Sequence, residues 1–350
     1  MTMWRSLVAM LLLWSAQVAA EVKTFVREYT YKAGEADSKL TARTNALEQV
    51  KKLLLEEIGV YLESKFENVA TETTVGDKST FKELTRSQIM SITAGVTETK
   101  ILSEKWDGEN YYLKAEIRID VDDVREKVKA IAKDRDRVME LEEMRRQANA
   151  RLSELDSLKK ELAKAKSDAE KAALKKTYGE SSTRLTSLDQ AEKGYNAYFR
   201  QKYDEALAHF TEAAKLDDGN YVVFFNLGTV RYALGDFAGA LPDFATALQI
   251  NPKYSPAFVN RGVAKIALKD YAGAAQDLSE AAKLNASDYF VHYNLACVYA
   301  LQGKQKDALD HLEAAFKAGF SDFNHLSRDT DLDNIRKSNE FKTLINRYKK

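Results

Sequence analysis

SLDQAEKGYNAYFRQKYDEALAHFTEAAKLDDGN, residues 187–220, opens a series of four 34-residue blocks that align with one another without a gap. The next three are YVVFFNLGTVRYALGDFAGALPDFATALQINPKY (221–254), SPAFVNRGVAKIALKDYAGAAQDLSEAAKLNASD (255–288) and YFVHYNLACVYALQGKQKDALDHLEAAFKAGFSD (289–322). A fixed period of this length indicates one supersecondary unit repeated along the chain.

The four blocks share small and bulky residues at fixed places. Gly194, Gly228, Gly262 and Ala296 fill the eighth place, alanine fills the twentieth and twenty-seventh, and Phe or Leu fills the twenty-fourth. Two antiparallel helices approach closely where Gly or Ala removes side-chain bulk, and bulky residues then fill the remaining groove. The pattern therefore predicts a helical hairpin in each block.

This pattern resembles the tetratricopeptide repeat (TPR), at 187–220, 221–254, 255–288 and 289–322. The resemblance implies an all-α superhelix with a concave inner face, because one hairpin cannot bury its apolar side alone and must stack on others. The segment 323–350 resembles the end of many bacterial TPR arrays and is expected to cap the last repeat. Its expected apolar contacts are Leu332, Ile335, Phe341, Leu344 and Ile345.

In TPRs, the first helix of each repeat lines the concave groove, so the resemblance implies a binding surface for an extended polypeptide. The groove is expected to be aromatic and neutral, and to recognise its ligand by stacking, apolar contact and backbone hydrogen bonds. It lacks the inner Lys or Arg that would pair with a C-terminal carboxylate. The residues placed on it are Tyr195, Tyr198, Phe199, Phe225, Asn226, Tyr232, Val259, Asn260, Val263, Ile266, Phe290, Tyr293 and Asn294.

Three asparagines, Asn226, Asn260 and Asn294, occupy the sixth place of successive blocks. Their carboxamides offer donors and acceptors that match the N–H and C=O groups of a bound peptide. Such a row resembles the asparagine ladder of TPR proteins that hold extended polypeptides. In the alternative, each asparagine bonds the backbone of the neighbouring repeat and has a structural role.

Residues 1–20 have the order of a secretory signal peptide, with Arg5, an apolar run from Leu7 to Trp14 and small residues before Glu21. The mature chain is then expected to start at Glu21, without a stable membrane span, because the run is shorter than the roughly 20 residues that cross a bilayer. An uncleaved membrane anchor is the alternative. Together with the repeats, the signal predicts a bacterial exported protein, periplasmic or secreted.

Residues 21–121 are expected to form an α+β domain with an antiparallel sheet and a helix. The sequence predicts strands at 22–32 and 91–96, a helix at 37–62, and a β-hairpin around Asp107 and Gly108. This order resembles the N-terminal domain of flagellar assembly protein T and related bacterial envelope lipoproteins. The resemblance implies an envelope role, although the lipid-attachment cysteine of the lipoproteins is missing.

Residues 122–178 are rich in Lys, Arg, Glu, Ala and Leu and contain no Gly or Pro, a composition that favours one long helix. Apolar residues at seven-residue spacing between Leu141 and Ala172, interrupted by Arg151, predict a coiled-coil-like stalk. The stalk is expected to pair with a second copy, giving a homo-oligomer, or to bridge the domains as a solvated helix, or to be disordered. The segment 178–183 is predicted to be a hinge.

The sequence does not indicate catalysis, nucleic-acid binding or metal binding. Lys plus Arg and Asp plus Glu number 53 each, so no net charge favours nucleic acid. The four histidines lack metal-ligand spacing, and there is no HExxH, CxxC or glycine-rich phosphate loop, so no metal or cofactor is expected. The lone Cys297 cannot form an intrachain disulfide and has no sequence-adjacent base. No catalytic residue is predicted.

The sequence thus predicts a non-enzymatic periplasmic scaffold, with an α+β domain, a long coiled-coil-like helix and an all-α TPR superhelix whose groove binds a partner polypeptide in the envelope. The alternative is a structural component of a flagellar or secretion-associated assembly, in which the repeats are packing modules. An enzyme is the third hypothesis.

Overall fold

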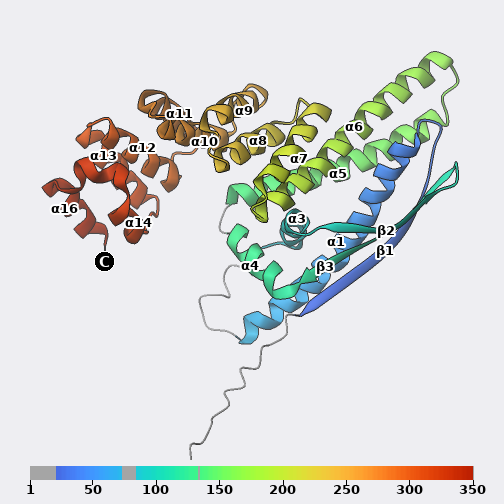
Figure 1. Ribbon diagram of the computed structural model, residues 1–350, viewed down its shortest axis with the longest axis horizontal. Helices are drawn as coiled ribbons and strands as arrows, with labels where there is room; N and C mark the ends of the chain where they lie inside the picture. Colours follow the sequence, from blue (N-terminus) through green and yellow to red (C-terminus); the bar gives the residue numbers. More distant parts are fainter. Residues whose placement is uncertain (1–20, 73–83, 133–134, 350) are drawn as a thin grey trace, which may run out of the picture.

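The computed structural model describes residues 21–72, 84–132 and 135–349, and the predicted signal peptide lies outside the described residues. A sheet with its helices comes first, a helical hairpin follows, and a stack of helix pairs ends the chain (Figure 1). None of the helices in the described part combines the length and the apolar character that a membrane crossing requires.

Three antiparallel strands form the N-terminal sheet, in the order β1-β3-β2. They are β1 (Val22–Lys32), β2 (Thr99–Trp106) and β3 (Asn110–Asp120). The predicted first strand and the predicted hairpin are confirmed. The hairpin turns where Gly108 takes a φ of +107°, and the Asp107 carboxylate accepts a 2.7 Å hydrogen bond from the backbone N–H of Asn110.

Helix α1 (Lys39–Glu72) covers one face of this sheet, as Figure 1 shows. The helix is predicted correctly but runs ten residues beyond the expected end at residue 62 (72 − 62). Its apolar residues recur every fourth position and pack against the inward side chains of β3, which alternate with polar ones. The buried set includes Ala42, Ala46, Val50, Leu54 and Ile58 of α1, and Tyr111, Leu113, Ala115, Ile117 and Ile119 of β3.

The strand predicted at 91–96 is wrong, because these residues belong to helix α3 (Arg86–Val96). Thr85 and Gln88 form a capping box that starts the helix. Buried hydroxyls inside it are satisfied locally: Thr93 Oγ1 donates to the Ile89 carbonyl oxygen at 2.7 Å. The β-branched residues favour a strand on propensity, but the cap and the burial of α3 override that preference.

The single long helix predicted for 122–178 is also wrong. The chain instead forms α4 (Val121–Ala132) and α5 (Arg135–Leu162), turns at 163–167, and returns in α6 (Asp168–Phe199). The turn contains neither Gly nor Pro, and Ser167 caps the next helix by accepting from the backbone N–H of Glu170.

The apolar face that predicted self-pairing is largely buried within the chain between Leu141 and Leu162, whereas Ala169 and Ala172 are exposed. The buried residues of this face in α5 are Leu141, Met144, Ala148, Leu155 and Leu162. Leu141 and Met144 join the core of the sheet domain, whereas Ala148 and Leu155 pack with Leu185 and Leu188 of α6. The residues from Leu141 to Leu162 thus have partners within the chain, and a homo-oligomer through 122–178 stays a prediction.

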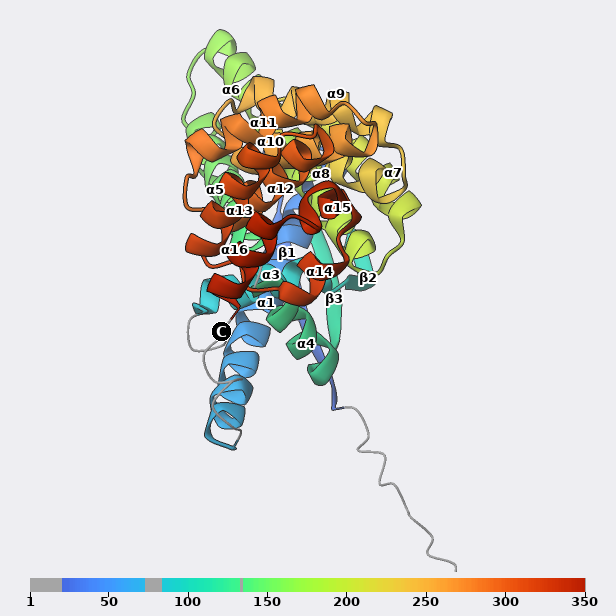
Figure 2. The ribbon, with the colours of Figure 1, turned by 90° about the vertical axis from the view of Figure 1, so that its left-hand side faces the viewer.

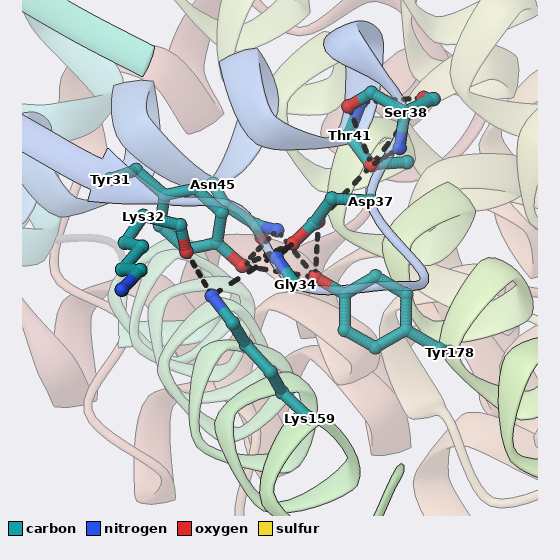
Figure 3. Close-up of polar contacts among 9 residues, drawn as sticks. All are labelled: Tyr31, Lys32, Gly34, Asp37, Ser38, Thr41, Asn45, Lys159 and Tyr178. Atoms are coloured by element: carbon teal, nitrogen blue, oxygen red, sulfur yellow. Dashed lines mark hydrogen bonds and ion pairs between the residues drawn. The ribbon is translucent and has the colours of Figure 1, made fainter. Parts of the chain in front are cut away.

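The hinge predicted at 178–183 lies in the middle of α6, which is continuous there. The Tyr178 hydroxyl donates to Asp37 at 2.5 Å and lies 3.0 Å from the Tyr31 hydroxyl (Figure 3). Asn45 Nδ2 donates to Tyr178 at 3.1 Å, and the Lys159 ammonium group lies 3.9 Å from the Asp37 carboxylate. These contacts fix the middle of α6 against the start of α1.

The end of α6 and seven further helices form the repeat stack, and the last short helices close it (Figures 1 and 2). The pairs are α6/α7 (Tyr203–Leu216), α8 (Tyr221–Ala233)/α9 (Phe237–Ile250), α10 (Ser255–Ala267)/α11 (Tyr271–Leu284) and α12 (Tyr289–Leu301)/α13 (Gln305–Lys317). The closing elements are α14 (Phe323–Arg328), η1 (Thr330–Leu332), α15 (Asp333–Arg336) and α16 (Asn339–Tyr348).

Glycine permits the close helix contact within a repeat. A Cβ atom at Gly194 would lie 2.8 Å from the ring of Phe210, and one at Gly228 would lie 2.8 Å from the ring of Phe244. Each bulky partner is the predicted twenty-fourth residue of the same block. Small and large residues therefore pack against each other as the spacing predicts.

One hydrophobic core joins the sheet domain to the first two repeats. It runs from Phe25 in β1 through Ile92 in α3 and Leu141 in α5 to Phe210 in α7 and Val230 in α8. The N-terminal domain and the start of the stack are consequently packed together through buried apolar side chains.

Candidate functional site

A cavity of about 790 Å³ lies between α5, α6, α8, α10 and the start of α12. Its volume lies within the roughly 300–1,000 Å³ of ligand pockets, and seven of the predicted groove residues line it. The lining is Arg137, Glu140, Tyr198, Phe225, Thr229, Tyr232, Ser255, Pro256, Val259, Asn260, Val263, Asn285, Ser287, Asp288, Tyr289 and Phe290.

The end of the groove over the first two repeats is filled by α5, which corrects the expectation of an open trough. The carboxylate of Glu140 accepts hydrogen bonds from the hydroxyls of Tyr195 and Tyr254, each at 2.7 Å, and lies 3.4 Å from Asn226 Nδ2. Tyr195 and Asn226 are therefore buried beneath a helix of the same chain rather than open to a ligand.

Arg137, one turn before Glu140 on α5, completes this arrangement. Its guanidinium donates to Glu140 at 2.8 Å and to Asn226 Oδ1 at 2.7 Å. It also lies over the rings of Tyr195 and Tyr198, 5.6 Å from each centroid. The charges of Arg137 and Glu140 thus compensate each other at the closed end of the cavity.

The two tyrosines that donate to Glu140 remain protonated. Burial raises the pKa of both Tyr195 and Tyr254, and the negative charge of Glu140 raises each pKa further. Both hydroxyls are consequently fixed as donors toward the carboxylate.

The three asparagines at equivalent places do not share one kind of partner. Asn226 donates to Tyr195 and to the Val222 carbonyl, at 2.6 and 2.8 Å. Asn260 lies on the cavity, 3.4 Å from the Thr229 hydroxyl, and Asn294 donates to a carbonyl of its own helix at 2.8 Å. Of these three, Asn260 is the one that lines the open cavity.

The far end of the predicted groove is covered by the closing segment. The hydroxyl of Tyr293 donates to the Asp329 carboxylate at 2.5 Å, and its ring stacks on Phe320 with centroids 4.6 Å apart. Tyr293 is buried, and burial followed by the hydrogen bond to Asp329 raises its pKa. Tyr293 and Asn294 therefore do not line the cavity, nor do Phe199 and Ile266.

Two exposed aromatic rings form the rim of the cavity at the start of α12. Phe290 is 51% exposed and Tyr289 is 46% exposed. Beside them, Asp288 caps α12 by accepting a 2.9 Å hydrogen bond from the backbone N–H of Phe290. Exposed rings beside a cavity are a feature of interaction sites.

A family model described as Tetratricopeptide repeat matches residues 192–255. The matched segment thus has the sequence of tetratricopeptide repeats. A chloroplastic protein from Arabidopsis thaliana is 38% identical to it over 56 residues, which are 16% of this chain and 17% of that relative. The chain therefore matches about one sixth of that relative's length.

Solved structures similar to this chain include three TPR structures. The first TPR of Spaghetti (RPAP3), bound to the HSP90 peptide SRMEEVD, is 28% identical and covers 32% of this chain and 89% of its own, with a TM-score of 0.32. The TPR domain of Arabidopsis OM64 is 28% identical, covering 33% and 96%, with a TM-score of 0.33. YrrB, a TPR protein described as having an unusual peptide-binding site, is 21% identical, covering 51% and 87%, with a TM-score of 0.38.

Within the described ranges, one group of side chains has the spacing of metal ligands: Cys297, Asp329 and Asp331. Asp329 already accepts the hydrogen bond of Tyr293, and Cys297 Sγ lies 3.5 Å from the same carboxylate oxygen. Burial raises the pKa of the Cys297 thiol, which is therefore protonated at neutral pH. A protonated thiol is a poor nucleophile. In the structure, the Asp329 carboxylate serves as the hydrogen-bond acceptor of Tyr293 and Cys297.

At the closed end of the cavity, Arg137, Glu140 and Tyr254 are not predicted from the sequence. The first two lie in the segment expected to be a stalk, and Tyr254 is the last residue of its block. A charged residue directly before the apolar Leu141 is typical of a solvated helix face. No local pattern indicates that Glu140 is buried, since the cover comes from repeats far along the chain.

Proposed function

We propose that the cavity over the second and third repeats binds a segment of another polypeptide, and that the protein acts as a non-enzymatic scaffold. The open cavity of about 790 Å³, lined by rings and the Asn260 carboxamide and bordered by the exposed Phe290, carries the proposal. Rings stack on apolar side chains, while the carboxamide bonds peptide groups. Compared with the groove predicted from sequence, this site is shorter and lies between α5 and the closing segment.

We further propose a bacterial cell envelope as the setting, with export by the signal peptide at 1–20 and a periplasmic or secreted mature chain. The order of a charged residue, an apolar run and small residues supports export. Mass spectrometry of the protein purified from the periplasm tests this part. A mature chain starting at Glu21 is expected, whereas an intact N-terminus in the cytoplasm contradicts it.

Photocrosslinking tests the binding role in cells. Phe290→p-benzoylphenylalanine places a photoreactive ring at the rim of the cavity, and the same replacement at Leu268 is the control. Leu268 is 42% exposed but does not line the cavity. Crosslinks to a defined segment of a partner are expected from Phe290 alone, and Tyr232→Ala is expected to suppress them. Equal crosslinks from both positions, or none from Phe290, rule out the cavity as the binding site.

The second candidate is a structural component of an envelope assembly. It is favoured by the core shared between the sheet domain and the first two repeats, since these repeats pack within the chain. Light scattering on the mature full chain distinguishes the two functions. Defined oligomers together with no crosslinks from the cavity favour the structural role.

A further inference from the structure

Glu140 is held in the groove like a bound ligand. Its side chain is only 4% exposed and comes from α5, outside the repeats. Two hydroxyls from different repeats, Tyr195 and Tyr254, donate to its two oxygens at 2.7 Å. The guanidinium of Arg137 donates at 2.8 Å, so the buried charge is both paired and hydrogen-bonded.

The groups around this carboxylate form a receptor for one oxyanion. A guanidinium and two phenol hydroxyls donate to its two oxygen atoms, and Asn226, which accepts from Arg137 and donates to Tyr195, supports these donors. Charge-assisted hydrogen bonds of this kind are stronger than neutral ones, and they suit a carboxylate. The receptor borders the open cavity, because Arg137 and Glu140 also line it.

We infer that Glu140 occupies, from within the chain, a carboxylate-binding site at the closed end of the groove, and that this occupancy restricts the partner to uncharged apolar segments. The inference rests on the proposed binding function of the cavity. It assigns to Glu140 a role in specificity, since the residue uses the donors that an acidic ligand would need.

The lining of the rest of the cavity suits an uncharged apolar segment. Phe225, Tyr232, Val259 and Val263 offer rings and methyl groups, and Phe290 extends them at the rim. Among the described residues that line the cavity, the charged ones are Arg137, Glu140 and Asp288. The positive charge of Arg137 is compensated by Glu140, so an incoming carboxylate would meet Asp288 and find no cation in excess.

Fluorescence polarisation on the mature full chain tests the inference with two labelled peptides. One is an uncharged heptapeptide with blocked ends that carries Phe and Leu at alternate positions, and the other is the acidic SRMEEVD with a free C-terminus. The wild type is expected to bind the uncharged peptide at least about tenfold more tightly than the acidic one. Equal binding of both peptides by the wild type overturns the inference without any variant.

Glu140→Ala is the decisive variant, because it removes the carboxylate that accepts the hydrogen bonds of Arg137, Tyr195 and Tyr254. The affinity for the acidic peptide is expected to rise about tenfold or more, as a hydrogen-bonded ion pair with Arg137 forms. The gain should disappear in the double variant E140A/R137A and fall in E140A/Y254F. If E140A keeps the wild-type circular dichroism spectrum and gains nothing, or if the gain survives in E140A/R137A, the inference is wrong.

The outcomes also separate this inference from the proposed function. An acidic-peptide gain in E140A without any binding of the uncharged peptide supports the receptor but contradicts binding in the open cavity. Binding of the uncharged peptide with no gain in E140A leaves the proposed function and removes the role of Glu140. Glu140→Gln fills the site with a neutral group of the same shape. Its affinity for the acidic peptide is therefore expected to rise less than that of E140A.

Discussion

The hydroxyl of Tyr178 donates a 2.5 Å hydrogen bond to the carboxylate of Asp37, 141 residues earlier in the chain. Asn45 and Tyr31 extend this contact into a network between the start of α1 and the middle of α6 (Figure 3). Burial raises the pKa of Tyr178, and the hydrogen bond to Asp37 raises it further, so the hydroxyl stays protonated and donating. The network therefore holds α6 in place where a hinge is expected from sequence.

Tyr178→Phe is expected to lower the free energy of unfolding by about 1–3 kcal/mol, because the Asp37 and Asn45 side chains lose a buried partner. Urea unfolding followed by circular dichroism measures the loss. Tyr289→Phe is the matched control, since its ring is exposed, and it should change stability by less than about 0.5 kcal/mol. Similar stabilities for Y178F and the wild type would show that the network contributes little.

Lys51 holds together a buried charge cluster between α1 and α6. Its ammonium group pairs with Asp189, with Glu48 at 3.0 Å and with Glu192 at 3.3 Å, while its side chain is 3% exposed. Burial opposes the charge of Lys51, but these carboxylates raise its pKa well above the ordinary value. Burial also opposes the charge of Asp189, yet Lys51 and Lys193 lower its pKa to about 2.

Lys51→Met is therefore expected to cost roughly 3–5 kcal/mol at pH 7, because Glu48, Asp189 and Glu192 lose the buried cation that all three share. In the wild type, the stabilising contribution of Asp189 is complete above its unfolded pKa and is lost only as the pH falls through about 2. In the variant, Glu48 and Asp189 take up protons more readily in the folded state.

The difference in unfolding free energy between the wild type and K51M should consequently shrink from pH 7 to pH 5. Urea titrations at both pH values measure it. A difference that stays constant across this range would mean that the carboxylates do not depend on Lys51.

Gly228→Ala is expected to destabilise the second repeat by about 1–3 kcal/mol, since its Cβ would meet the Phe244 ring at 2.8 Å. Gly179→Ala is the control, and it is expected to change the free energy of unfolding in the opposite direction. A Cβ there meets nothing within 4 Å, and the residue lies inside α6, so alanine should stabilise the protein by about 0.5–1 kcal/mol. Chemical unfolding measures both, and equal effects would contradict the packing explanation.

Phe290→Ala is expected to leave stability within about 0.5 kcal/mol of the wild type, because half of the side chain is exposed. Affinity for the uncharged Phe- and Leu-containing heptapeptide should nevertheless fall about tenfold, as an aromatic anchor is lost. Fluorescence polarisation and urea unfolding measure the two effects. Leu268→Ala, which removes an exposed side chain away from the cavity, should alter neither.

The repeat region is predictable because its decisive contacts are close in sequence. Gly228 and Phe244 belong to one hairpin, and the same pair of places recurs every 34 residues, so periodicity alone reveals them. The β-hairpin is predictable for a similar reason, because Asp107 and Gly108 fix a local turn between alternating runs.

The rest depends on contacts between distant residues. Periodicity in α5 shows that Leu141 and Leu155 face a partner, but it does not distinguish a second copy from α6 of the same chain. Glu140 and Tyr254 are 114 residues apart, and each is unremarkable in its local sequence. The sequence therefore predicts which helices form the inner side of the stack, but it does not predict the helix that covers part of that side.

Helix α6 limits where the chain can be cut to give a stable recombinant fragment. Asp168–Phe199 is a single helix that serves both the sheet domain and the first repeat. A recombinant fragment that begins at residue 184 would present the apolar side chains of Leu185 and Leu188 to solvent and should precipitate. Differential scanning calorimetry of the intact chain should accordingly give one endotherm for the sheet domain and the adjoining repeats, because neither melts without the other.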